Sequence, residues 1–73
     1  MALTLKDVGR FCGKVRRKHG VTQVHVAMSV NYSPENVSAF EKGHNNNAML
    51  LAYYLDRFSA YEAFRDFMRG VDE

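Results

Sequence analysis

Residues 22–43 of this 73-residue chain read TQVHVAMSVNYSPENVSAFEKG, and this stretch decides the fold. Ser33 is a residue type that caps helix N-termini, and Pro34 follows it at the first helical position, where a missing N–H costs little. Thr22 is a second N-cap candidate, ahead of a short segment that reads as helix. The stretch therefore predicts two short helices, each beginning at its own cap.

The connection between these two helices is a tight turn. We expect the helices over residues 23–29 and 34–42, with Asn31 between them in the left-handed region that asparagine tolerates. Gly43 suits the residue that stops the second helix. Two short helices joined by a turn of about three to four residues make a helix-turn-helix, so residues 22–43 are its predicted core.

The segments on either side read as helix too. Thr4, with an acidic residue in the turn that follows, is typical of an N-cap, and the helix it opens ends at Gly20. Residues 48–57 are apolar almost all round, as expected of a helix that is covered on several sides. A last helix spans residues 60–69. The sequence predicts an all-α fold of five short helices in a single domain over residues 1–73.

One charged residue of the first helix falls among apolar ones. At about 100° per residue, the apolar stripe consists of Leu5, Val8, Cys12, Val15 and His19, with Phe11 at its edge. Arg16 lies on this stripe, beside Cys12. Because an unpaired buried charge is very costly, we expect Arg16 to bind a carboxylate.

Residues 22–43 resemble the core of the Cro/repressor-type (XRE-like) DNA-binding domain, and the similarity extends over residues 5–57. The matching landmarks are Arg16, Thr22-Gln23, Ala27, Ser33-Pro34, Val37, Ser38 and the ending Phe40-Glu41-Lys42-Gly43. The resemblance implies a lambda-repressor-like fold with the helix-turn-helix at its second and third helices. It also implies a structural ion pair between Arg16 and Glu41, which supplies the carboxylate that Arg16 needs.

The resemblance also assigns roles in DNA binding. Base edges in the major groove would face Pro34, Glu35, Asn36 and Ala39. Asparagine pairs with adenine, glutamate accepts a hydrogen bond from cytosine, and alanine contacts a thymine methyl group. The sugar-phosphate backbone would contact Gln23, Ser38, Lys42, His44, Asn45 and Asn47. The alternatives are a solvent-facing Gln23 and a plain flexible connector at residues 44–47.

The ten basic and eight acidic residues are unevenly distributed. Residues 1–20 have a local net charge of +5, residues 21–47 have −1 and the remainder has −2. Such a charge asymmetry orients a small protein toward an anionic surface. Four basic side chains lie opposite the apolar stripe: Lys6, Arg10, Lys14 and Arg17. The last three either reach a flanking phosphate or form a solvated face.

The third predicted helix has no Arg or Lys in its first two turns, and Glu35 repels phosphates. We therefore expect modest affinity for each monomer and a homodimer on two half-sites. Residues 58–71 offer a surface for dimerisation or for docking a partner protein, because Tyr61, Phe64, Phe67 and Met68 share one face. The alternative is that these side chains simply cap the core.

Several classes of protein are not indicated. No apolar run approaches the roughly 20 residues that a membrane span needs, and the N-terminus lacks the apolar segment of a signal peptide. The single cysteine, Cys12, forms no internal disulfide, and no cysteine pair, glycine-rich phosphate loop or convergent carboxylate pair is present. We expect no metal, no cofactor, no catalytic residue and no enzymatic activity, in the reducing cytoplasm of a bacterium or a phage-infected host.

The expected function is sequence-specific binding of double-stranded operator DNA by a small transcriptional regulator, a repressor or Cro-like protein of a phage or mobile element. It would act by occupying its operator. Rival hypotheses keep the fold but bind a protein. An antirepressor-like inhibitor is favoured by Glu35 and the low net charge, and an antitoxin would dock its partner through residues 58–71. Gln23, Lys42 and the polar loop favour DNA.

Overall fold

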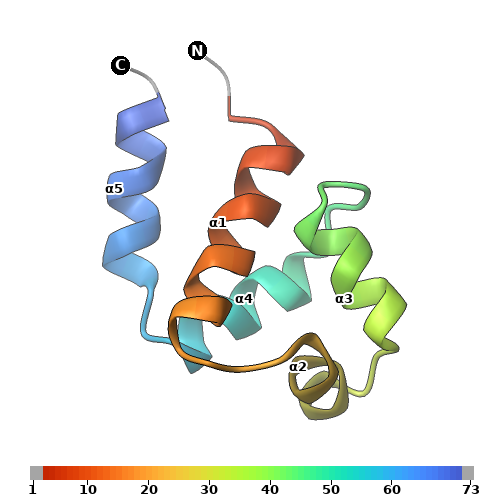
Figure 1. Cartoon of the computed structure of the whole chain (residues 1–73). Coiled ribbons are helices and arrows are strands. Elements are labelled where there is room, and N and C mark those ends of the chain that lie inside the picture. The colour runs from red at the N-terminus through yellow and green to blue at the C-terminus, as the bar shows by residue number, and fades with distance from the viewer. Residues whose placement is uncertain (1–2, 72–73) are drawn as a thin grey trace.

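The computed structural model describes residues 3–71, and over that range the chain forms five helices and no strand (Figure 1). The predicted all-α class with five short helices is confirmed. The predicted single domain also includes residues 1–2 and 72–73, which lie outside the described residues. The helices are α1 (Leu5–Lys18), α2 (Gln23–Val30), α3 (Pro34–Glu41), α4 (Ala48–Arg57) and α5 (Tyr61–Val71).

Side-chain hydrogen bonds within a few residues explain where helices α1 to α4 begin. Thr4 and Asp7 form a capping box at α1, in which each backbone N–H donates to the other side chain at 3.1 Å. The side-chain oxygens of Thr22, Ser33 and Asn47 accept from backbone N–H groups in the first turns of α2, α3 and α4. The caps at Thr4, Thr22 and Ser33 are the signals from which the starts of α1, α2 and α3 were predicted, whereas the cap at Asn47 was not predicted.

The turn between α2 and α3 depends on Asn31, which has φ 60° and ψ 42°. This left-handed conformation lets the backbone N–H groups of Asn31 and Tyr32 both donate to the carbonyl of Ala27. Gly43 ends the next helix in the same region, with φ 81°. The expected conformation of Asn31 is therefore confirmed.

The helices surround a thin core. In Figure 1, α5 runs antiparallel to α1 on one side, α3 lies on the other side, and α4 crosses behind α1. Arg16 is buried, with 8% of the whole residue exposed. The largest fully buried side chains are Tyr54, Leu50, Val26, Val37 and Cys12.

The C-terminal end of α3 lies directly against α1, and two glycines permit the contact. A Cβ atom on Gly9 would stand 2.5 Å from the backbone oxygens of Phe40 and Glu41. A Cβ atom on Gly43 would stand 2.5 Å from the Cα of Lys6. Both distances are far below van der Waals contact, so backbone packs on backbone at this junction. The junction fixes the direction in which α3 leaves the body.

The four aromatic and sulfur-containing residues predicted to share one face of the last helix do not behave alike. Phe64 is buried, and Phe67 packs against the core through Phe11, with ring centroids 5.2 Å and 5.0 Å from that of Phe11. Tyr61 and Met68 are exposed. The helix also begins and ends one to two residues later than predicted. Phe64 and Phe67 therefore cap the core, as one of the two alternatives expected, whereas Tyr61 and Met68 on the same helix do not.

The apolar stripe predicted for the first helix is also shorter than expected. Leu5 and His19, at its two ends, are exposed, whereas Cys12 and Arg16 in the middle are buried. The helix is longer than the core it covers, so the ends of the stripe extend past the packed helices. His19 still contacts the ring of Phe58, with centroids 4.9 Å apart.

Candidate nucleic-acid interface

One carboxylate, that of Glu41, joins four helices. Arg16 of α1 donates to it twice, from Nε at 2.7 Å and from Nη2 at 3.1 Å. Gln23 of α2 donates from Nε2 at 3.0 Å, and the hydroxyl of Tyr54 in α4 donates to Oε2. The structure therefore contains the ion pair expected between Arg16 and Glu41, with two further donors around it.

Electrostatics hold this cluster in its charged form. Burial raises the pKa of the Glu41 carboxyl, but hydrogen bonds from Arg16, Tyr54 and Gln23 outweigh burial, and the pKa lies below its ordinary value. The remaining Arg16 donor, Nη1, binds the backbone carbonyl of Val21 at 2.8 Å. The guanidinium is thus bonded on three of its nitrogens, and its charge is fully compensated.

Tyr54 is the member of this cluster that the sequence did not reveal. It was predicted only as one apolar residue of a well-covered helix. Burial, and then the hydrogen bond to Glu41, raises the pKa of the Tyr54 hydroxyl, so Tyr54 donates at any physiological pH. The sequence offered only a general indication: a buried tyrosine hydroxyl needs a hydrogen-bond partner, but nothing identified Glu41 as that partner.

The free end of α3 presents the predicted base-reading residues to solvent. Pro34, Glu35 and Asn36 are exposed, and Ala39 is half-buried one turn later. Val37 and Phe40 are buried on the opposite side of the helix. Pro34, Glu35 and Asn36 are therefore open to solvent, whereas Ala39 is partly covered.

The predicted backbone-contacting residues after α3 are divided between surface and structural positions. Lys42 and His44 are exposed. Asn45 is half-buried, and its side-chain oxygen accepts from the N–H of Asn47 at 3.3 Å. The side-chain oxygen of Asn47 accepts from the N–H of Leu50 at 3.1 Å and caps α4. These hydrogen bonds order the segment, in contrast to a plain flexible connector.

Gln23 and Ser38, the other two predicted backbone contacts, are both half-buried. The Gln23 amide braces α3 through Glu41, so it is not simply solvent-facing. A contact between either side chain and a phosphate stays a prediction.

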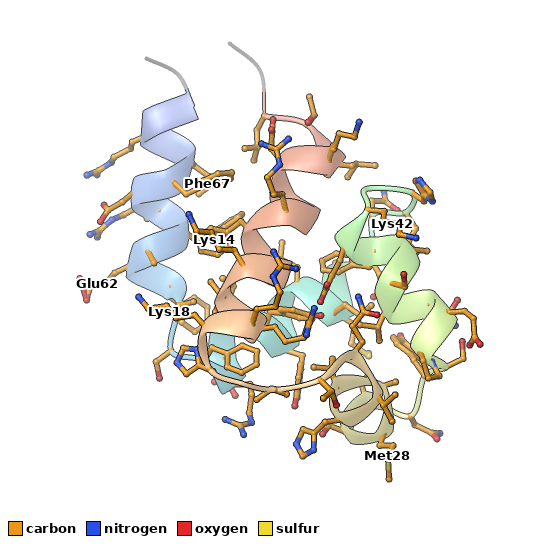
Figure 2. The ribbon with its side chains drawn as sticks, in the orientation of Figure 1. Lys14, Lys18, Met28, Lys42, Glu62 and Phe67 are labelled. Carbon is orange, nitrogen blue, oxygen red and sulfur yellow. The ribbon has the colours of Figure 1, made fainter. Side chains whose placement is uncertain are left out.

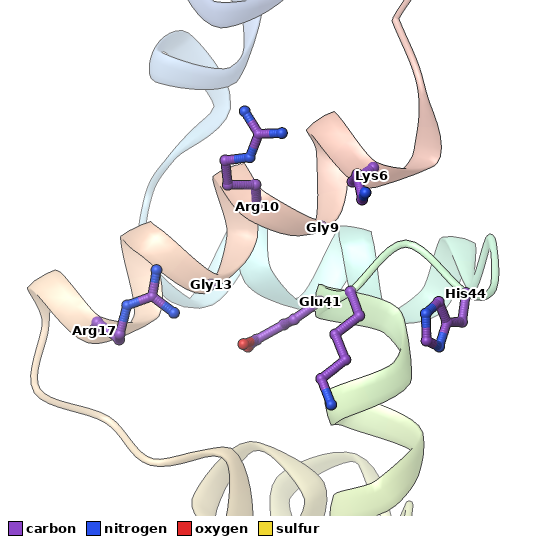
Figure 3. Close-up of a pocket in the computed structure, with 8 residues that line it drawn as sticks. Lys6, Gly9, Arg10, Gly13, Arg17, Glu41 and His44 are labelled. Atoms are coloured by element: carbon purple, nitrogen blue, oxygen red, sulfur yellow. The ribbon is translucent and has the colours of Figure 1, made fainter.

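A groove between α1 and α3 gathers basic side chains that lie far apart in the sequence (Figure 3). Helix α1 contributes three cationic side chains to this groove, those of Lys6, Arg10 and Arg17. Lys42, at the C-cap of α3, lies on the other side of the groove. The groove is lined by Lys6, Gly9, Arg10, Gly13, Arg17, Glu41, Lys42 and His44. The sequence placed the α1 cations opposite the apolar stripe but did not place them beside α3. Gly9 and Gly13 lie one helical turn apart on α1, and this spacing could have indicated that another helix packs closely against that face.

The other two exposed cations of α1, Lys14 and Lys18, lie on another side of the helix. Figure 2 shows Lys14 and Lys18 on the side of α1 that is nearer to α5. Together with Arg10 they border a second groove, whose floor is Phe11, Val15, Ala63 and Phe67. The basic residues of the first helix are therefore split between two surfaces.

Comparisons of the chain with protein-family models, with curated proteins and with solved structures found no match.

Other chemistry within residues 3–71 is limited. Cys12 is fully buried, and burial, assisted by the nearby Glu41 charge, raises the pKa of its thiol to about 12. No group of three or more His, Cys, Asp or Glu residues in this range is arranged to hold a metal ion. No helix among the described residues has the length and apolar character needed to cross a membrane.

Proposed function

We propose that the chain is a transcriptional regulator that binds double-stranded DNA through α3, in a lambda-repressor-like helix-turn-helix formed by α2 and α3. The contrast between the two ends of α3 carries the proposal. Its last residue, Glu41, is held by side chains from three other helices, whereas its first turn, Pro34 to Asn36, is exposed. A firmly anchored helix with free leading residues suits insertion into a major groove.

The dimensions and side chains of α3 support this role. Its 8 residues make a helix about 12 Å long, comparable with the width of about 12 Å of the major groove of B-DNA. Asn36 offers paired donor and acceptor atoms to adenine, and Glu35 accepts from the amino group of cytosine. The Ala39 methyl contacts a thymine methyl. Discrimination between bases would therefore come mainly from Glu35 and Asn36.

Affinity would come from outside the reading helix, since Pro34–Glu41 contains no Lys or Arg and Lys42 stands only at its C-cap. Each monomer then binds weakly, and a homodimer on two half-sites compensates for this. We infer that the protein acts by occupying an operator in the cytoplasm of a bacterium or a phage-infected host, without metal, cofactor or enzymatic step.

The test begins with selection of bound duplexes from a random library, followed by anisotropy titrations of the selected duplex. Affinity should fall steeply between about 50 and 200 mM salt, as expected when phosphates are neutralised. Asn36→Ala should weaken discrimination at one base position by about 1–3 kcal/mol. Recovery of no preferred sequence, together with weak binding at low salt, would refute sequence-specific regulation.

A matched pair of acidic residues controls for charge. Glu35 and Glu62 are both acidic residues in the first turn of a helix, α3 and α5 respectively. Replacing either with alanine removes one negative charge. Glu35→Ala should change the base preference, whereas Glu62→Ala should leave it unaltered. Equal effects of the two variants would mean that α3 does not read bases.

A second candidate function is favoured by exposed apolar side chains beside the reading helix. Val24 and Met28, one turn apart on α2, are 53% and 77% exposed, and Met49 of α4 is 63% exposed. Such side chains, together with the acidic Glu35, suit the protein-binding surface of an antirepressor-like inhibitor. Failure to bind any duplex at low salt would favour this candidate over the regulator.

A further inference from the structure

The groove between α1 and α3 holds cations that lack carboxylate partners. Among residues 3–71, the ion pairs with carboxylates involve Arg10, Arg16 and Arg65, and none involves Lys6, Arg17 or Lys42. These three side chains line the groove from both walls, with the exposed His44 at one end. The groove thus has positive charge that the described part of the protein does not neutralise.

Glu41 lies in this groove but does not cancel its charge. Its side chain is only 6% exposed, and Arg16 neutralises it at 2.7 Å. Arg10, at the edge of the groove, is within 3.8 Å of the Asp7 carboxylate. The excess positive charge therefore belongs to Lys6, Arg17 and Lys42.

We propose that this groove binds phosphate groups, and that its physiological occupant is one strand of the DNA backbone. The choice of DNA as the source of the phosphate groups rests on the proposed function. A guanidinium binds phosphate through two parallel hydrogen bonds, and ammonium groups add charge without strict geometry. Arg17 is therefore the primary contact, with Lys6 and Lys42 on either side of the strand.

The geometry around Arg17 fits this assignment. A Cβ atom on Gly13 would stand 3.2 Å from Arg17 Nη1 and 2.9 Å from Glu41 Oε1, so the guanidinium and the carboxylate bound by Arg16 both lie over a helix position that has no side chain. Arg17 also lines the neighbouring hollow at the start of α2, together with Thr22 and Gln23. A strand that passes from the N-terminus of α2 to Lys42 crosses Arg17 and runs beside the exposed face of α3. Backbone contacts and base reading then occur on one continuous surface.

The assignment separates two pairs of cations that lie on the same helix. Lys6 and Arg17 face the groove, whereas Lys14 and Lys18 of the same helix lie nearer to α5 (Figures 2 and 3). Removing a charge from either pair changes the net charge equally. A difference between the pairs therefore reports contact with phosphate and excludes a general effect of net charge.

The experiment measures binding of the full chain to a non-specific duplex over a range of salt concentrations. Lys6→Gln and Arg17→Gln should each make the slope of log K against log salt less steep by about 0.9 and weaken binding at low salt. Lys14→Gln and Lys18→Gln should keep the wild-type slope. Thermal melts of all four variants check that these exposed substitutions leave the fold intact. Equal slopes for the two pairs, with normal binding by the wild type, would overturn the groove assignment and leave α3 reading intact.

A second arm uses inorganic phosphate and follows backbone amide resonances of the groove by NMR, with chloride as the reference anion. Duplex binding together with small, weak shifts from free phosphate supports the DNA backbone as the occupant. Saturable shifts at Arg17 and Lys42 without duplex binding support a phosphate site for a small ligand and overturn both the DNA occupant and the proposed regulator. No response in either arm would overturn the phosphate site itself.

Discussion

At the scale of single residues, Glu41 has more structural consequence than any base-reading candidate. Its carboxylate accepts hydrogen bonds from Arg16, Gln23 and Tyr54, which lie on three different helices. Removing the carboxylate leaves a buried guanidinium without its counter-charge and a buried hydroxyl without its acceptor. Such losses are much larger than those at exposed ion pairs.

Glu41→Ala should therefore lower the free energy of unfolding by about 3–5 kcal/mol. Glu35→Ala, at an exposed position on the same helix, should change it by less than about 0.5 kcal/mol. Urea titrations followed by circular dichroism measure both values. A Glu41→Ala variant as stable as the wild type would show that the cluster contributes nothing to stability.

The lowered pKa of Glu41 also predicts how stability depends on pH. In the unfolded chain the carboxyl is protonated near about pH 4.3, whereas in the folded chain it stays ionised to lower pH. The contribution of ionised Glu41 to the free energy of unfolding is therefore complete above the pKa of the unfolded chain. It is lost as the pH falls through the pKa of Glu41 in the folded chain. Unfolding titrations from about pH 7 to pH 3 should show this loss.

Glu41→Gln should flatten the acid dependence without removing it. Asp7 also has a lowered pKa, because its carboxylate is bound by the Thr4 side chain and backbone. Identical pH profiles for the wild type and Glu41→Gln would contradict the assignment to Glu41.

At the scale of elements, the junction of α1 with α3 depends on the absence of a side chain at Gly9. The end of α3 approaches to a distance at which a Cβ atom would overlap two backbone carbonyls. Backbone atoms in a helix cannot move aside as a flexible side chain does. This contact sets both the direction of α3 and the width of the basic groove.

Gly9→Ala should lower the free energy of unfolding by about 1–3 kcal/mol, since the two helices must separate. Gly70→Ala is the matched control, because Gly70 lies in α5 with open space around a Cβ atom. That substitution should stabilise the protein by about 0.5–1 kcal/mol, through the better helix propensity of alanine. Thermal and urea unfolding compare the two variants, and stabilisation by both would mean that α1 and α3 tolerate a wider spacing.

At the scale of the whole molecule, the core is thin, so the stability of the fold depends on each helix that covers it. The Cα radius of gyration is 11.6 Å, close to the roughly 11 Å expected of a compact domain of this length. A chain of this size buries only about 60% of its unfolded surface. α5 closes one side of this core through Phe64 and Phe67, which contact Phe11.

Phe64→Ala should therefore cost about 3–5 kcal/mol, a large part of the stability of so small a domain. Tyr61→Ala, on an exposed position of α5, should cost less than about 1 kcal/mol. Differential scanning calorimetry distinguishes these outcomes. A loss at Tyr61 as large as that at Phe64 would indicate that α5 buries both residues, for example in a dimer.

The chain by itself determined the features that depend on neighbours within a turn of helix. Short-range hydrogen bonding and steric preference determine the caps at Thr4, Thr22 and Ser33 and the left-handed conformation of Asn31. These features could therefore be predicted from the sequence. Helical spacing likewise placed Arg16 among apolar residues. The extent of the core could not be predicted from the sequence, which is why Leu5 and His19 were wrongly placed on the packed stripe of the first helix.

Only the tertiary structure decided which distant residues meet. Tyr54 reaches Glu41, and Lys6 and Arg17 share a groove with Lys42, because the end of α3 packs directly on the backbone of α1 at Gly9. That packing depends on long-range contacts and shape complementarity between helices, which no local pattern encodes. The division of the basic residues between two surfaces follows from the same contact.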